Sequence, residues 1–258
     1  MRTLRLLAAT VRDFGVADTL DRLPLYLLSP LTRSRLRRRK LAQLSEDGFD
    51  AVHGTDTAVI LVGKELGLDF TAGGHVVPRY ETSSEAAIRM PLDSLPIDHA
   101  RFTFVDLGCG KGKPLLVAAS YPFRRLVGVD VSPVCIEVAR RNVARYGPEH
   151  IDPSRVELLC LDAEDFEFPL DPLVVYLFDP FPGAVLEHVV ANLEHSLEQR
   201  PREVYVVFLN PHGAAPFRRS TLFRRVPTIA DRMPSVAPGT RPYEQAAVFV
   251  ARSSARPL

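Results

Sequence analysis

The amino-acid sequence predicts an α/β protein: a doubly wound sheet of seven strands, mostly parallel, with a helical N-terminal extension. Three observations predict it. From residue 101 onward, apolar runs of strand length alternate with segments of helix length. The strand-length runs are apolar on both faces, as in a parallel sheet that helices cover on both sides. Several of these runs end at an aspartate, at the edge where such sheets bind ligands.

Strands and helices follow one another in a regular order after residue 101. The pattern predicts strands over 102–105, 125–129, 156–161 and 173–178, which end at Asp106, Asp130, Asp162 and Asp179. A fifth strand is expected over 203–209, and two more over 222–228 and 245–251. Helices are expected over 111–120, 134–146 and 183–198. Ser132 and Pro133 supply an N-cap and a first-turn proline for the second helix, which Gly147 and Pro148 end.

The composition is that of a globular protein. The chain has 258 residues, 46% hydrophobic and 24% charged, which excludes a disordered chain. The net charge of +1 gives no global attraction to nucleic acid or to an anionic membrane. No run approaches the 18 or so apolar residues of a transmembrane helix. Because the alternation of strands and helices begins at residue 101, we expect a sheet domain over 101–258 and an extension over 1–100.

The extension carries two opposed charge blocks. Residues 1–45 have a net charge of +7 and residues 46–100 a net charge of −7. The basic run at 33–40 is typical of a solvated helix face, and phosphate or nucleic-acid binding is the alternative. The three cysteines, Cys109, Cys135 and Cys160, have no metal-ligand spacing and fall in apolar runs. We interpret them as reduced core residues of a cytoplasmic protein.

A glycine-rich segment follows the first strand and opens a helix. Residues 106–112 read Asp-Leu-Gly-Cys-Gly-Lys-Gly, and the glycines allow a tight turn and the close approach of a ligand to backbone N–H groups. The dinucleotide fingerprint G-x-G-x-x-G would need glycine at position 113, where the chain has Lys113. The segment therefore argues against a nicotinamide dehydrogenase.

The pattern D-x-G-x-G-x-G resembles motif I of the class I S-adenosylmethionine-dependent methyltransferases, and the resemblance extends from residue 101 to about residue 252. It implies a Rossmann-like methyltransferase sheet with S-adenosyl-L-methionine as cofactor and S-adenosyl-L-homocysteine as product. The implied cofactor-binding residues are Asp106, Gly108, Cys109, Gly110 and Gly112 at the amino-acid end, Asp130 with Val131 at the ribose, and Asp162 with Ala163 at the adenine.

A second resemblance lies upstream. Tyr80-Glu81-Thr82-Ser83 resembles the cofactor-covering loop of the Dot1-type, non-SET lysine methyltransferases, with one spacer residue missing after the tyrosine. It implies that Tyr80, Glu81 and Thr82 lie over the methionine part of the cofactor, where a tyrosine face stabilises the sulfonium by cation–π attraction. The alternative is that the segment merely starts a helix, with Ser83 or Thr82 as its N-cap.

The residues after the fourth strand indicate which kind of group accepts the methyl group. Asp179-Pro180-Phe181 resembles the Asn/Asp-Pro-Pro-aromatic motif of amine methyltransferases, with Phe181 in place of the second proline. The resemblance implies that Asp179 lies at the cofactor and the acceptor. Asp179 and His212 are candidate bases, with His75 as a further candidate. Together with Tyr80 beside the sulfonium, Asp179 and His212 are the candidate catalytic residues.

These observations predict a cytoplasmic S-adenosylmethionine-dependent methyltransferase. We expect the acceptor to be an amine of a protein, a peptide or a small metabolite, with O-methylation of a hydroxyl or carboxylate as the alternative. Aminopropyl transfer is a rival from another enzyme class, and a non-catalytic S-adenosylmethionine-binding partner protein is a rival outside the enzymes. No metal site, membrane or nucleic-acid partner is expected, and the oligomeric state stays open.

Overall fold

The computed structural model describes residues 48–61, 63–68, 71–72, 75–76, 80–178, 181, 183–227 and 246–251, together with Val11. Most of the basic block at 1–45, including the run at 33–40, lies outside these residues. The division into an extension over 1–100 and a sheet domain over 101–258 therefore stays a prediction. Among the described residues, no helix is long and apolar enough to cross a membrane.

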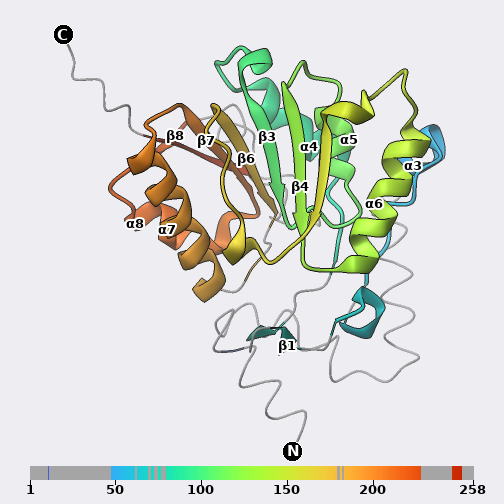
Figure 1. The fold of residues 1–258 in the computed structure, drawn as a ribbon, viewed down its shortest axis with the longest axis horizontal. Helices are drawn as coiled ribbons and strands as arrows, with labels where there is room; N and C mark the ends of the chain where they lie inside the picture. Colours follow the sequence, from blue (N-terminus) through green and yellow to red (C-terminus); the bar gives the residue numbers. More distant parts are fainter. Residues whose placement is uncertain are drawn as a thin grey trace, which may run out of the picture.

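A seven-stranded sheet forms the centre of the fold, in the order β5-β4-β3-β6-β7-β9-β8 (Figure 1). The strands are β3 (Thr103–Leu107), β4 (Arg125–Asp130), β5 (Val156–Cys160), β6 (Leu173–Phe178), β7 (Val204–Leu209), β8 (Phe223–Val226) and β9 (Ala246–Ala251). The first five are parallel, and β9 is antiparallel to both β7 and β8. This arrangement confirms the predicted fold class. It also places a reversal of strand order beside β3, where open α/β sheets bind ligands.

Helices connect the strands where the pattern predicts them. The α-helices of the sheet domain are α5 (Lys113–Ala118), α6 (Pro133–Tyr146), α7 (Gly183–Gln199) and α8 (Ala215–Arg219). Short 3-10 helices are η2 (His99–Arg101), η3 (Pro153–Arg155), η4 (Ala163–Asp165) and η5 (Pro211–Gly213). The side chain of Ser132 caps α6 by accepting from the N–H of Cys135, as expected. The helix predicted over 111–120 begins later, because Gly112 has a left-handed backbone with φ 86°.

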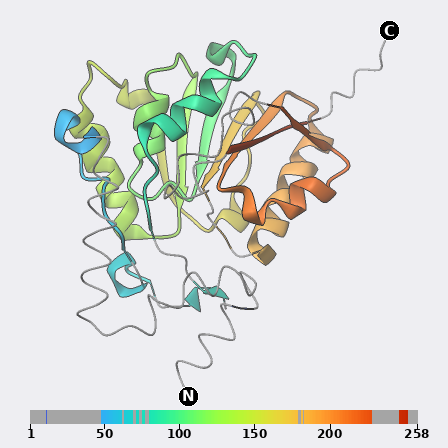
Figure 2. The same ribbon diagram turned by 180° about the vertical axis from the view of Figure 1, so that it is seen from behind.

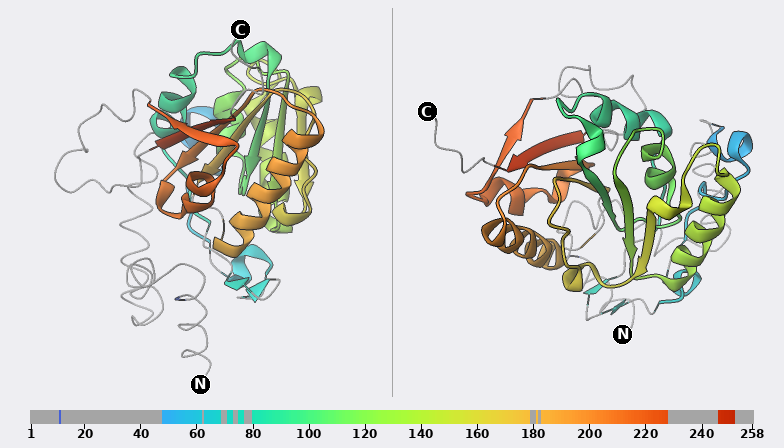
Figure 3. Two further views of the ribbon diagram at one scale, coloured as in Figure 1. Left: turned by 90° about the vertical axis from the view of Figure 1, so that its left-hand side faces the viewer. Right: turned by 45° about the horizontal axis from the view of Figure 1, so that its top comes forward.

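The two faces of the sheet bury alternate residues of each strand. Phe104 and Tyr176 face the core that α5, α6 and α4 (Glu85–Asp93) cover. Their neighbours Val105 and Val175 face the other core, which α7 and α8 cover. Figures 2 and 3 show the helices on both sides of the strands. The strands are apolar throughout because both of their faces are buried.

Part of the extension lies at the carboxyl edge of the sheet. Its described elements before α4 are α3 (Phe49–His53), η1 (Gly63–Leu66), β1 (Thr71–Ala72) and β2 (His75–Val76). In Figure 1 the arrows of β3 and β4 point toward the segment that contains β1. The Ser132 hydroxyl donates a 2.6 Å hydrogen bond to the carbonyl of Leu66, which ties η1 to the start of α6.

One expectation about the cysteines is wrong. Cys109 and Cys135 are buried, but Cys160 is exposed. Cys160 ends β5, an edge strand of the described sheet, and the residues of this strand are less buried than those of β3 beside β4. All three cysteines are free of disulfides.

Candidate functional site

The glycine turn joins β3 to α5 at the carboxyl edge of the sheet. Gly108, Gly110 and Gly112 all have positive φ, at 85°, 52° and 86°, a region where other L-residues are strained. The N–H groups of Gly108 and Cys109 both donate to the carbonyl of Val129, at 2.8 and 3.0 Å. These bonds attach the turn to the end of β4.

Asp106 lies directly before the turn and is 1% exposed. It does not end the strand as expected, because β3 continues to Leu107 and Asp106 pairs in the ladder with Gly128 and Tyr176. Its Oδ2 atom is buried and has no hydrogen-bond partner among the residues that the structure describes. Burial and the nearby Asp130 carboxylate raise its pKa well above the usual value. An unpaired buried carboxyl oxygen is costly, and a donor from a bound ligand, above all a cationic one, would relieve that cost.

Asp130 ends β4, as expected, and links the turn to α6. Its Oδ2 accepts from the N–H of Gly110 and its Oδ1 from the N–H of Ser132, both at 2.8 Å. Burial raises the pKa of the carboxyl, and these two hydrogen bonds act in the opposite direction. A carboxylate oxygen accepts more than one hydrogen bond, so both oxygens remain able to receive a ligand hydroxyl. Val131, the next residue, is 38% exposed and offers an apolar surface beside the carboxylate.

Tyr80 lies over the glycine turn. A Cβ atom added to Gly110 would overlap the ring of Tyr80, so glycine is what permits this contact. The phenol donates a 2.8 Å hydrogen bond to the carbonyl of Thr57, and the backbone of Tyr80 pairs with Leu61. Burial raises the pKa of the phenol well above its usual value, so Tyr80 stays protonated near neutral pH and does not act as a base.

The residues after Tyr80 run from the turn to α4. Thr82 is buried, with its hydroxyl 3.4 Å from the carbonyl of Ser83. The Ser83 hydroxyl lies 3.2 Å from the hydroxyl of Tyr176 on β6, so this segment contacts the sheet. The N-cap of α4 is Ser84, whose side chain accepts from the N–H of Ala87 at 3.2 Å. The expected N-cap at Ser83 or Thr82 is therefore wrong, because the helix starts later along the chain.

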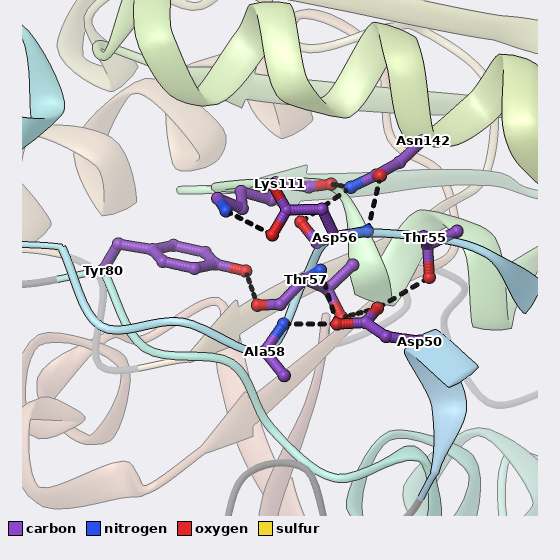
Figure 4. A network of polar contacts seen from close by, with 8 residues as sticks. All are labelled: Asp50, Thr55, Asp56, Thr57, Ala58, Tyr80, Lys111 and Asn142. Atoms are coloured by element: carbon purple, nitrogen blue, oxygen red, sulfur yellow. Dashed lines mark hydrogen bonds and ion pairs between the residues drawn. The ribbon is translucent and has the colours of Figure 1, made fainter. Parts of the chain in front are cut away.

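A polar network that the sequence analysis missed surrounds the hydroxyl of Tyr80 (Figure 4). Asn142 on α6 bonds to both backbone groups of Asp56 and to the carbonyl of Lys111. The ammonium of Lys111, within the turn, forms a 2.8 Å ion pair with Asp56. The two partners of Asn142 lie 86 and 31 residues away along the chain, so no local motif indicates the network.

Asp162 follows β5 and caps a short helix. Its carboxylate accepts from the N–H of Glu164 at 3.1 Å, and the next residue, Ala163, is 5% exposed. Asp162 thus comes to the same sheet edge as Asp106 and Asp130, as expected, and its role toward an adenine stays a prediction.

Several candidate residues cannot be placed. Asp179 and Pro180 lie outside the described residues, as do the side chains of His75 and His212. Phe181 is described and packs against the core that α7 covers. Among the described residues, no group of three or more His, Cys, Asp or Glu side chains is arranged to hold a metal ion.

The donor and acceptor groups of this edge fit S-adenosylmethionine. An unpaired buried carboxyl oxygen on Asp106 suits an ammonium group, and the two oxygens of Asp130 suit neighbouring hydroxyls. The positive-φ glycines leave the backbone open to close approach.

Comparison with known families finds one match in this part of the chain. Residues 104–200 match the model of a family described as "Methyltransferase domain". The matched stretch runs from β3 to the end of α7, and it contains Asp106, the glycine turn, Asp130 and Asp162. The match therefore contains the sheet-edge part of the site, whereas Tyr80 and the segment beside it lie before the matched residues.

One curated relative is a ribosomal protein L11 methyltransferase from Tolumonas auensis, 27% identical over 161 residues. The match covers 59% of this chain and 51% of the relative, so the chain spans about half of that protein's length.

One solved structure that the chain matches is a ribosomal protein L11 methylase from Lactobacillus delbrueckii subsp. bulgaricus. It is 15% identical with a TM-score of 0.41, and the match covers 65% of this chain and 77% of that chain. Another is an RNA methyltransferase from Salinibacter ruber in complex with S-adenosyl-L-homocysteine, 20% identical with a TM-score of 0.38, covering 70% and 97%.

Proposed function

We propose that this protein is an S-adenosylmethionine-dependent methyltransferase. The observation that carries the proposal is the buried, unpaired carboxyl oxygen of Asp106, which lies before a three-glycine turn that Asp130 holds. These residues fall inside the stretch that matches a methyltransferase domain. The cofactor is S-adenosyl-L-methionine, and the product formed from it is S-adenosyl-L-homocysteine.

Different residues of the carboxyl edge bind different parts of the cofactor. Asp106 and the backbone of the turn hold its amino-acid end, and Asp130 accepts hydrogen bonds from the two ribose hydroxyls. Asp162 and Ala163 serve the adenine. The segment of Tyr80, Glu81 and Thr82 covers the methionine part, which is supported by the contact of the Tyr80 ring with Gly110.

The chain contributes mainly by positioning. When bound, S-adenosylmethionine supplies an electrophilic methyl group on a sulfonium centre. Holding a nucleophile in line with that group accounts for as much as about 7–11 kcal/mol of the barrier. The ring of Tyr80 stabilises positive charge next to the turn by cation–π attraction. Since its phenol stays protonated, Tyr80 has a binding role, and a separate group takes the proton of the acceptor.

We propose an amine of a protein, a peptide or a small metabolite as the acceptor, with a hydroxyl or carboxylate as the alternative. The segment Asp179-Pro180-Phe181 supports an amine, because an aspartate oxygen and a proline carbonyl both accept hydrogen bonds from N–H groups. Asp179 and His212 are the proposed bases. The name of the curated relative, which acts on a ribosomal protein, supports a protein acceptor. The three unpaired cysteines support a reducing compartment such as the cytoplasm.

Calorimetry with S-adenosylmethionine and S-adenosylhomocysteine tests the cofactor. We expect both to bind, and Asp106→Asn to weaken binding by about tenfold or more, because an amide cannot ionise to the carboxylate that a bound ammonium group favours. Absence of binding by the natural chain at millimolar concentration would refute the proposal. An unchanged affinity in Asp106→Asn would refute the role of Asp106.

Transfer of a labelled methyl group to components of a producing-cell lysate tests the enzyme activity. The mass added to the labelled product separates methyl from aminopropyl transfer, since the first adds one carbon and the second adds three. Binding without any transfer would favour a non-catalytic S-adenosylmethionine-binding partner protein.

A further inference from the structure

Asn142 fastens a segment of the extension to the glycine turn. Its side chain is fully buried, in the middle of α6. The carboxamide oxygen accepts from the N–H of Asp56 at 2.9 Å, and the nitrogen donates to the carbonyls of Asp56 and Lys111, at 3.1 and 2.9 Å. Both N–H groups and the oxygen are thus used. The ion pair between Lys111 and Asp56, at 2.8 Å, joins the same two segments a second time (Figure 4).

Asp50 fixes the next part of the same segment. One carboxylate oxygen accepts from the hydroxyls of Thr55 and Thr57, at 2.6 and 2.8 Å. The other accepts from the N–H groups of Thr57 and Ala58, at 2.8 and 2.7 Å. Asn142 therefore holds the backbone at Asp56, and Asp50 holds the residues on both sides of it. Thr57 is bound by Asp50 and directly follows the residue that Asn142 holds, and its carbonyl accepts from the hydroxyl of Tyr80 at 2.8 Å.

We infer that Asn142 is a positioning residue for the cofactor site and acts through Tyr80. The chain of contacts runs from Asn142 to the backbone of Asp56, to the carbonyl of Thr57, to the phenol of Tyr80, and from its ring to Gly110. Asn142 thereby sets the place of the ring over the turn without touching the ligand. The inference rests on the proposed function, because it concerns the affinity for the same cofactor.

A merely structural asparagine would act differently. It would contribute to the free energy of unfolding, but its loss would change ligand affinity equally with and without the Tyr80 ring. A residue that acts through Tyr80 loses its effect on affinity once the ring is absent. A double-mutant cycle separates these two cases.

The experiment measures the affinity of the full chain for S-adenosylhomocysteine by calorimetry. The variants are Asn142→Ala, Tyr80→Ala and their combination, with Tyr80→Phe to remove the hydroxyl alone. We expect Asn142→Ala to weaken binding by about fivefold to tenfold in the natural chain and by less than about twofold in Tyr80→Ala. Tyr80→Phe should weaken binding in the same direction, because the ring loses its anchor on Thr57.

A control variant accounts for loss of stability. Ser196→Ala removes a buried hydroxyl that bonds to Arg202 near the end of α7, on the other side of the sheet from Asn142. We expect it to lower the midpoint of unfolding without changing affinity. If Asn142→Ala does not fold, Asn142→Ser takes its place in the cycle, because it keeps a polar group at the buried position but is too short to keep all three hydrogen bonds.

A cofactor-free measurement separates failure of the inference from failure of the proposed function. In protein with 13C-labelled tyrosine, the ring signal of Tyr80 is the one that disappears in Tyr80→Phe. We expect Asn142→Ala to shift this signal in the absence of any ligand, while Ser196→Ala leaves it in place. An unshifted signal, or equal losses of affinity in both Tyr80 backgrounds, would overturn the inference. If Asn142→Ala shifts the signal but the natural chain binds no S-adenosylhomocysteine, the positioning of Tyr80 is supported and the proposed function is refuted.

Discussion

The ring of Tyr80 lies against the backbone of Gly110, so closely that a Cβ atom on residue 110 would overlap it. The two residues belong to different parts of the chain: Tyr80 follows the short strands of the extension, and Gly110 is in the turn between β3 and α5. Their contact makes the extension part of the wall of the proposed cofactor site. Substitution of Gly110 by alanine, which adds one methyl group, therefore tests the contact.

We expect Gly110→Ala to lower the free energy of unfolding more than Gly54→Ala does. Both positions have positive φ, 52° and 66°, so both alanines pay a backbone strain of about 1–2 kcal/mol. The alanine at 110 would overlap the ring of Tyr80, whereas no described residue lies within 4 Å of a Cβ atom at 54. Overpacking adds about 1–3 kcal/mol at 110. Urea unfolding of the two variants measures the difference, and equal losses would show that Tyr80 does not press on the turn.

Asp130→Ala should weaken the binding of S-adenosylhomocysteine by about tenfold or more. The substitution removes the acceptors of the proposed ribose hydroxyls and of the N–H groups of Gly110 and Ser132. Calorimetry measures the affinity, with Asp165→Ala as the control, because Asp165 is a carboxylate on η4 without a proposed role. The ribose assignment would be wrong if Asp130→Ala bound as tightly as the natural chain.

The carboxylate of Asp50 should make stability fall in acid. Burial raises the pKa of this carboxyl, but the hydrogen bonds from Thr55, Ala58 and Thr57 together lower it more, so its pKa lies below the ordinary value. A depressed pKa means that the ionised group stabilises the fold above about pH 4, and that this contribution is lost as the pH falls through the folded-state pKa. Water screens the partly exposed group, so the contribution is at most about 1 kcal/mol.

Asp50→Asn isolates this contribution, because the amide keeps the shape while the threonine hydroxyls reorient to accept from it. We expect the variant to be less stable than the natural chain at pH 7, with the gap closing toward pH 3. Urea unfolding across this range measures it. A constant gap over the range would show that the ionisation of Asp50 is not linked to folding.

The thiols should react unequally. Cys160 is exposed, whereas Cys109 and Cys135 are buried. Burial raises the pKa of the Cys109 thiol well above its usual value and that of Cys135 to about 12, so both stay protonated and unreactive. We expect a thiol reagent to modify one cysteine rapidly in the native protein and all three in denaturant, as counted by mass spectrometry. Cys160→Ser should abolish the rapid phase; a rapid phase that persists would place another thiol at the surface.

Local signals in the sequence predict much of the fold. The strand predicted over 173–178 has the bounds of β6, because a continuous apolar run of this length between helix-length segments is typical of a strand buried on both faces. The N-cap at Ser132 is predictable because serine before proline is a local helix-start signal. The N-cap of α4 is not, because three hydroxyl residues in a row, Thr82, Ser83 and Ser84, offer the same chemistry. Only packing against Tyr176 distinguishes Ser83 from Ser84.

The sequence by itself determined the succession of the strands along the chain, the glycine turn after β3 and the arrival of Asp106, Asp130 and Asp162 at one edge of the sheet. These properties follow from hydrophobic periodicity and from residue types at short spacing. Only the tertiary structure decided that Asp106 is buried with an unpaired oxygen, that Cys160 is exposed and that Asn142 holds the segment beneath Tyr80. These properties depend on residues that are far apart along the chain. Neither hydrophobic periodicity nor a local motif indicates which distant residues will come together.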